Sequence, residues 1–297
     1  AKDAGINPIL GYEAYIAPKS RFNKDASGMK EASYHLTLLA KNAAGFRNLI
    51  KLASIAYLEG FYYKPRIDRE VLEAHSEGLI CLSGCVSGEL SHTLLKAGDG
   101  SMGDALDVAR WFHKTFEDRY FVEIQSNGLE IQQMAMERSV EVARKLGLPL
   151  GATSDAHYVN REDAEAQDVL LCINTGRFRT DTNRMRMEGS EFYLRSAAEM
   201  HEYFPGFEEA LGQSQLIADS VDIELDLGQR HFPNFTPPDQ KTPSDYLREL
   251  CVAGLKDRYE GNEEMLPGGQ LSQRVIDRLD RELGVINTLG FPNYFLI

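Results

Sequence analysis

The sequence predicts an α/β fold in which a parallel sheet or β/α barrel precedes a mainly helical segment. Short apolar runs alternate with amphipathic stretches over residues 1–228, which is typical of a β/α fold. The pattern then changes to a proline-rich stretch and two amphipathic helices. An apolar fraction of 43% is enough to build a sizeable core.

The predicted elements follow one another without an internal repeat. Apolar runs typical of strands occupy residues 7–17, 34–40, 78–85, 119–125 and 148–154. Amphipathic stretches typical of helices occupy residues 43–60, 88–98, 102–116, 129–147 and 162–176. In a barrel, the carboxyl ends of the strands would lie on one face and would carry any site.

The C-terminal part begins with a connector over residues 229–246, which contains four prolines. Helices are predicted over 244–259 and 272–290, with Ser244 and Ser272 as their N-caps. Both chain ends lie within apparently continuing elements, so we expect an internal piece of a longer protein.

The net charge of −13 disfavours a freestanding nucleic-acid-binding module, which usually carries a basic surplus. One local exception is a loop with four arginines, which faces either solvent or phosphate: Arg177, Arg179, Arg184 and Arg186. No apolar run is long enough to cross a membrane.

The four cysteines form no CxxC pair and no evident disulfide framework: Cys81, Cys85, Cys172 and Cys251. This pattern, without a secretion signal, indicates a reducing cytoplasm.

The stretch GATSDAHYVN places Asp155 and His157 directly after a predicted strand. In extended backbone these two side chains point to the same side, where a carboxylate and an imidazole suit a metal ion. A helix-capping Asp followed by a surface His explains the same residues. Taken alone, the Asp-x-His pattern favours that explanation.

Three further candidates lie in or near predicted strands: Glu13, His35 and Cys85. Each alone is better explained as a solvent-facing Glu, a structural His or a small buried Cys. Taken together with Asp155 and His157, they offer oxygen, nitrogen and sulfur donors, which favour zinc or another borderline divalent ion. The sequence has neither a P-loop nor a GxSxG motif, and Cys81 is expected in the core.

Several long stretches resemble the alpha subunits of bacterial DNA polymerase III. They include INPILGYEAYIAP, HLTLLAKNAAGFRNLIKLAS, CLSGCVSGEL, TSDAHYVNREDAEAQDVLLCINTG and ELGVINTLGFPNYFLI, and the resemblance covers essentially the whole chain. It implies that residues 1–228 form most of a PHP domain, a distorted β/α barrel with a multinuclear metal site, without its first strands. Residues 229–297 would then be a connector and the beginning of the palm domain.

The resemblance also implies site residues. The metal ligands would be Glu13, His35, Cys85, Asp155 and His157, holding a divalent ion such as zinc or manganese. Lys64 and Arg66 either bind phosphate near this site or form surface ion pairs, and we weigh the two roles equally. The palm's catalytic aspartates would lie beyond Ile297.

For the longer protein, the resemblance implies a cytoplasmic, magnesium-dependent DNA-directed DNA polymerase. It would act on primer-template DNA and dNTPs with replicase partners such as the sliding clamp. In some family members the PHP site is proposed to be a 3′→5′ proofreading exonuclease. Two alternatives stay open: a freestanding PHP phosphatase such as a histidinol phosphatase, and a non-catalytic PHP scaffold.

Overall fold

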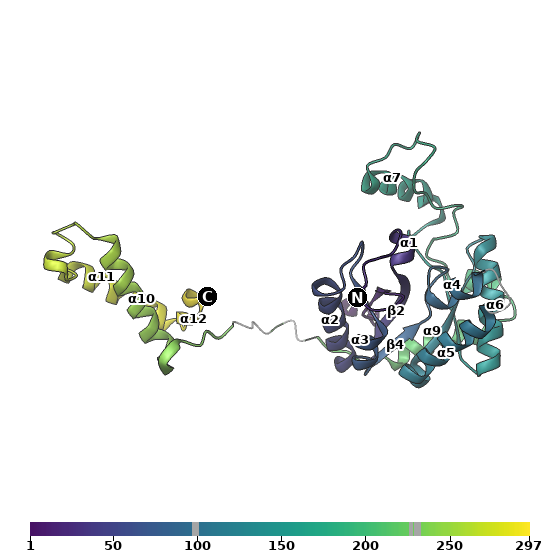
Figure 1. Cartoon of the computed structure of the whole chain (residues 1–297), viewed down its shortest axis with the longest axis horizontal. Helices are drawn as coiled ribbons and strands as arrows, with labels where there is room; N and C mark the ends of the chain where they lie inside the picture. Colours follow the sequence, from purple (N-terminus) through teal and green to yellow (C-terminus); the bar gives the residue numbers. More distant parts are fainter. Residues whose placement is uncertain (97–100, 226–227, 229–232) are drawn as a thin grey trace. The chain divides into compact units, whose positions relative to one another are not determined.

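A computed structural model describes residues 1–96, 101–225, 228 and 233–297. The chain divides into two compact units, 1–224 and 225–297 (Figure 1). The sequence prediction placed the boundary at residue 228. The last two residues of the helix predicted over 88–98, and residues 229–232 of the predicted connector, lie outside the described part.

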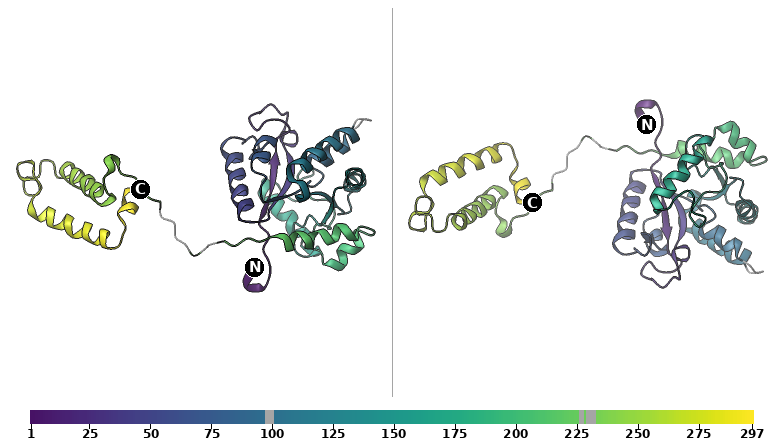
Figure 2. Two further views of the ribbon diagram at one scale, coloured as in Figure 1. Left: turned by 90° about the horizontal axis from the view of Figure 1, so that it is seen from below. Right: turned by 90° about the horizontal axis from the view of Figure 1, so that it is seen from above.

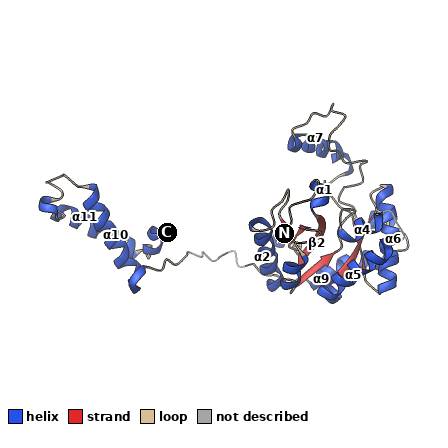
Figure 3. Ribbon diagram, in the orientation of Figure 1, coloured by secondary structure: helices blue, strands red, loops and turns tan. Residues whose placement is uncertain are grey.

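The first unit is built on a six-stranded sheet with the strand order β3-β1-β2-β4-β5-β6. Figure 3 draws the strands in red among the helices. The strands are β1 (Gly11–Ile16), β2 (Tyr34–Ala40), β3 (Arg66–Ile67), β4 (Leu79–Leu82), β5 (Tyr120–Gln125) and β6 (Leu150–Thr153). The α/β class predicted from the sequence is confirmed, and the five predicted strands are all present.

The sheet is mixed, whereas the β–α alternation predicted a parallel one. Strand β2 runs antiparallel to both β1 and β4, and the other three pairs are parallel. Between β1 and β2 the only helix is the four-residue α1 (Met29–Ala32), which is too short for the crossover that parallel neighbours need.

Helices cover both faces of the sheet (Figures 1 and 2). The helices of the first unit are α2 (Ala43–Leu58), α3 (Arg69–Ala74), α4 (Glu89–Leu95), α5 (Ser101–Phe116), α6 (Glu130–Leu146), α7 (Ala164–Thr175), α8 (Ala197–Tyr203) and α9 (Glu208–Ser220). Helix α7 projects away from the sheet (Figure 1). Strand β4 shows the two layers. Leu79 and Cys81 join the large core with α2, α4 and α5, whereas Ile80 and Leu82 pack with residues of α9 and its end. Cys81 is fully buried, as predicted.

Strands β1 and β2 present one apolar and one polar face. Ala14 and Ile16 are buried in the core, so Glu13 and Tyr15 point to the opposite face. This polar face of the sheet carries the first candidate site residues.

The second unit consists of α10 (Pro243–Arg258), α11 (Gln273–Thr288) and α12 (Pro292–Leu296). Leu247, Leu279 and Leu283 form its small core. The N-cap of α10 is Thr242, whose hydroxyl accepts from the Asp245 N–H, and not Ser244 as predicted. Pro243 occupies the first helical turn and moves the start of the helix ahead of Ser244. Ser272 is at the N-cap of α11, as predicted. Within the described residues, no helix is both long and apolar enough to span a bilayer.

Candidate metal centre

Glu13 and His35 meet across the antiparallel pair β1–β2. The register pairs Glu13 with Thr37 and Tyr15 with His35, so Glu13 and His35 are diagonal neighbours on the polar face. The Glu13 Oε1 lies 2.6 Å from the His35 Nδ1. The Tyr15 ring packs edge-on against the imidazole at 5.2 Å between centroids. A carboxylate and an imidazole are therefore held together by strand pairing.

Cys85 reaches the same imidazole from the turn after β4. Its Sγ lies 3.6 Å from the His35 Nδ1. The backbone N–H of His35 donates to the Ser87 carbonyl at 3.0 Å. Gly84 makes this approach possible, because it has a φ of 84° and a Cβ there would lie 2.7 Å from the His35 carbonyl oxygen. The three donors Glu13, His35 and Cys85, called the triad below, thus meet around one nitrogen.

Asp155 and His157 come together through a turn and not through strand alternation. Strand β6 ends at Thr153, and Asp155 has a φ of +50°, so the extended-backbone argument is wrong. The turn leaves the His157 Nδ1 2.8 Å from the Asp155 carbonyl and 3.9 Å from its Oδ1. The His157 N–H donates to the Phe192 carbonyl at 2.7 Å, which fixes the turn.

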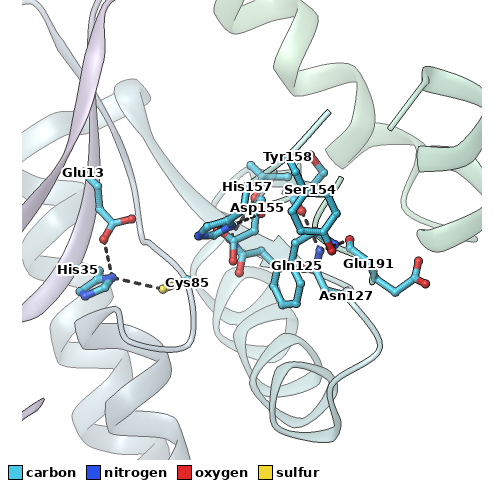
Figure 4. Close-up of polar contacts among 12 residues, drawn as sticks. Glu13, His35, Cys85, Gln125, Asn127, Ser154, Asp155, His157, Tyr158 and Glu191 are labelled. Carbon is cyan, nitrogen blue, oxygen red and sulfur yellow. Dashed lines mark hydrogen bonds and ion pairs between the residues drawn. The ribbon is translucent and has the colours of Figure 1, made fainter. Parts of the chain in front are cut away.

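The charges of the triad and of the Asp155–His157 pair act on each other, and Figure 4 shows them as neighbouring groups. Hydrogen bonds of the imidazole to Cys85 and Glu13 raise the pKa of His35 to about 10. The hydrogen bond from His35 lowers the pKa of Glu13, and the charge of His157 lowers it further. Burial raises the pKa of Asp155, against the effect of His157. All five predicted ligands therefore belong to one electrostatic neighbourhood.

The oxygen, nitrogen and sulfur donors are the types of ligand that a borderline divalent ion prefers. For all of them to bind one ion, the Glu13–His35 contact must lengthen. Two nitrogen or oxygen ligands of a tetrahedral zinc lie about 3.3 Å apart, and a nitrogen and a sulfur ligand about 3.5 Å. The Cys85–His35 distance of 3.6 Å matches, whereas the Glu13–His35 distance of 2.6 Å is that of a hydrogen bond. Within the described ranges, no three His, Cys, Asp or Glu side chains are arranged to bind one ion as they stand.

The two cations that were predicted near phosphate lie in different surroundings. Arg66 is only 2% exposed and donates to the backbone carbonyls of Arg21, Asn23, Ala32 and Gly60 at 2.8–3.0 Å. These bonds favour a structural role for Arg66. Lys64 is half-buried, lies 5.4 Å from the Tyr15 ring centroid, and its charge lowers the pKa of Glu13. Lys64 thus remains the candidate for phosphate.

Two arginines of the loop after α7 are paired with carboxylates. Arg184 donates to both Asp168 oxygens, at 2.5 and 2.9 Å, and Arg179 donates to Glu165 at 2.7 Å. The hydrogen bond from Arg184 lowers the pKa of Asp168. For these two residues, the pairing favours a structural role over a phosphate-facing one.

The sequence analysis missed a buried polar face on and beyond β5. Glu123, Gln125 and Asn127 are 7%, 7% and 1% exposed. Glu123 is hydrogen-bonded to Gly84 beside Cys85, and Asn127 to Ser154 beside Asp155. The signal was visible in VEIQSN, where polar residues recur at every second position of an otherwise apolar strand. The sequence analysis identified this stretch only as a strand and named none of the three residues as candidates.

Comparisons with known proteins agree with this architecture. Residues 1–127 match the PHP domain family, and residues 245–297 match the bacterial DNA polymerase III alpha NTPase domain family. A DNA polymerase III subunit alpha from Borreliella burgdorferi is 44% identical over 100% of this chain and 25% of its own length. The chain belongs to the DNA polymerase III alpha-subunit family. The DNA polymerase III alpha subunits of Treponema pallidum and Thermus aquaticus are 40% and 38% identical to it, each over 99% of the chain.

The chain spans about a quarter of the length of these relatives. Its PHP match contains Glu13, His35 and Cys85, whereas Asp155 and His157 lie beyond the matched residues. Membership of the DNA polymerase III alpha family therefore does not by itself assign the pair to the triad's site.

Proposed function

We propose that Glu13, His35, Cys85, Asp155 and His157 bind divalent metal, zinc or manganese, in a phosphoesterase site that removes nucleotides from DNA 3′ ends. The contact of Glu13 and Cys85 with one His35 nitrogen carries this proposal. Support also comes from the Asp155–His157 pair, whose charges act on the triad.

For the whole protein we propose template-directed DNA synthesis. The names of the relatives and the family match at residues 245–297 support this function over a freestanding phosphatase such as histidinol phosphatase. Magnesium, primer-template DNA, dNTPs and the sliding clamp are the cofactor and partners that we propose for that activity. The palm residues that would perform it lie outside this chain.

The chemistry of the site follows from its donors. A divalent ion lowers the pKa of bound water and stabilises charge on phosphoryl oxygens when it is present. The chain itself contributes the ligands and a cation: Lys64 lies close enough for its charge to act on Glu13. In a chain with a net charge of −13, such a local cation offsets the repulsion that DNA would meet.

A purely structural PHP domain is the second candidate, because the Glu13–His35 contact has the length of a hydrogen bond. As a hydrogen-bonded cluster, the triad would fasten the Cys85 turn to β2 without any ion. The metal-site proposal requires this contact to open by less than 1 Å, whereas the structural proposal requires it to persist.

The test uses the full-length protein that carries this chain. Metal content, degradation of a 3′-labelled primer and dNTP incorporation are measured for the unmodified protein and for His157→Ala. A matched control is His201→Ala, since His201 is an exposed histidine of α8. We expect His157→Ala to lower metal content and to slow degradation by about tenfold or more, with synthesis changed less than about twofold.

The outcomes separate the two candidates. Loss of degradation in His157→Ala but not in His201→Ala supports the metal site. Equal metal content and equal degradation in all three proteins would overturn it and leave the structural function.

A further inference from the structure

The feature that the proposed site leaves unexplained is the buried polar face of residues 123, 125 and 127. Alternation along the strand directs Glu123 and Gln125 to one side, and Asn127 follows them in the next residues. A buried carboxylate and two buried amides are costly unless each is hydrogen-bonded. Their partners therefore show what this face holds in place.

The Glu123 carboxylate bonds to two separate segments. Its Oε2 accepts from the Gly84 N–H at 3.1 Å, and its Oε1 accepts from the Thr153 hydroxyl at 2.6 Å. The Gln125 side-chain amide also donates to Oε1, at 3.0 Å. Gly84 immediately precedes Cys85, and Thr153 lies two residues before Asp155. One carboxylate thus spans the two turns that carry candidate ligands.

Asn127 adds a second tie on the Asp155 side. Its side-chain amide donates to the Ser154 carbonyl at 2.7 Å and to the Glu191 carbonyl at 2.8 Å. Gln132 fixes Asn127 in turn, because it accepts from the Asn127 N–H and donates to its side-chain oxygen. Thr153 and Ser154, the two residues that lead into Asp155, are therefore each hydrogen-bonded to a side chain from residues 123–127.

We propose that Glu123 is a positioning residue that couples the Cys85 turn to the Asp155–His157 turn. Its two oxygens set the separation between the triad and the pair. In terms of catalysis this inference rests on the proposed metal site, but the coupling itself is a property of the chain and is measurable without metal.

The coupling requires a carboxylate and not merely a polar side chain. A glutamine has one accepting oxygen and one donating nitrogen, so Glu123→Gln cannot accept at both ends. In one orientation the new amide nitrogen faces the Gly84 N–H. In the other it faces the Gln125 amide, and the Thr153 hydroxyl must turn from donor to acceptor. The substitution nearly preserves volume, so it weakens the tie without opening a cavity.

The first measurement is amide hydrogen exchange at Gly84 in the full-length, metal-free protein. We expect exchange to be faster by roughly tenfold or more in Glu123→Gln. The decisive variant is Thr153→Val, which alters only the far end of the tie and should still speed exchange at Gly84 by about threefold. Thr153→Ser keeps the hydroxyl and should match the unmodified protein.

A matched control is Thr93→Val, which makes the same hydroxyl-to-methyl change. Thr93 is buried, and its hydroxyl donates to the Glu89 carbonyl within α4 and not to Glu123. Thr93→Val should leave the rate of amide exchange at Gly84 unchanged. If Thr153→Val leaves Gly84 unchanged as well, or if Thr93→Val speeds it equally, the coupling is overturned.

The second measurement is Co²⁺ affinity, followed by the thiolate-to-cobalt absorption band. We expect Glu123→Gln to weaken binding by about 10- to 100-fold, with Thr93→Val unchanged. Coupled exchange without cobalt binding in the unmodified protein would support the coupling and overturn the proposed metal site. Cobalt binding that Glu123→Gln leaves unaltered would overturn the positioning role.

Discussion

Replacing Arg66 by methionine tests whether this buried cation is structural. The guanidinium donates four hydrogen bonds to backbone carbonyls, and three of these bonds are buried. A buried acceptor that loses its partner costs about 1–3 kcal/mol, and some of this is recovered because the guanidinium no longer has to be desolvated. We therefore expect Arg66→Met to lower the free energy of unfolding of the first unit by about 3–5 kcal/mol.

The assay is urea unfolding followed by circular dichroism, with Lys64→Met as the matched control. Lys64 is half-buried, contacts the Tyr15 ring and acts on Glu13 through its charge, so its removal should cost less than about 1 kcal/mol. If Arg66→Met unfolds at the same urea concentration as the unmodified chain, the bonds of Arg66 to the loop of residues 17–33 do not stabilise the fold. Phosphate binding would then again be the better explanation for Arg66.

Three further predictions concern separate parts of the chain. Gly45→Ala should cost about 2–3 kcal/mol, because its Cβ would lie 1.8 Å from the Gly78 carbonyl oxygen, whereas Gly103→Ala meets nothing and should cost little; thermal unfolding compares them. In the chelator-treated chain, the raised pKa of His35 should add stability that is full below pH 6.5 and is lost as pH rises through about 10; a flat difference between the unmodified chain and His35→Gln from pH 6 to 10 would contradict this. Leu279→Ala should destabilise the second unit by about 2–4 kcal/mol, and the unfolding transition of the first unit should not move.

Local pattern was enough to predict most elements. The strand predicted over residues 34–40 has those bounds, and the helix predicted over 43–60 ends two residues earlier, at Leu58. The antiparallel direction of β2 was not predicted, although its alternation of apolar and polar residues is typical of antiparallel strands. Direction depends on the connection between β1 and β2, which carries only one helical turn.

For the candidate site, too, the sequence predicted some features and the structure was needed for others. Family resemblance supplied the five candidate ligands, and the structure shows how Glu13 and Cys85 both contact His35. The left-handed backbone of Asp155 could not be read from the sequence, because a non-glycine residue gives little signal for positive φ. The polar alternation around Glu123 was visible in VEIQSN, but its bonds to two separate turns could be recognised only once both partners were placed.

The central claim is that the triad and the Asp155–His157 pair hold one divalent metal centre. X-ray absorption at the zinc edge of the full-length, zinc-loaded protein tests it most directly. We expect a sulfur shell at about 2.3 Å together with nitrogen and oxygen ligands at about 2.0–2.1 Å, and the sulfur shell should disappear in Cys85→Ser. Bound zinc without a sulfur shell, or one that survives in Cys85→Ser, would contradict the account.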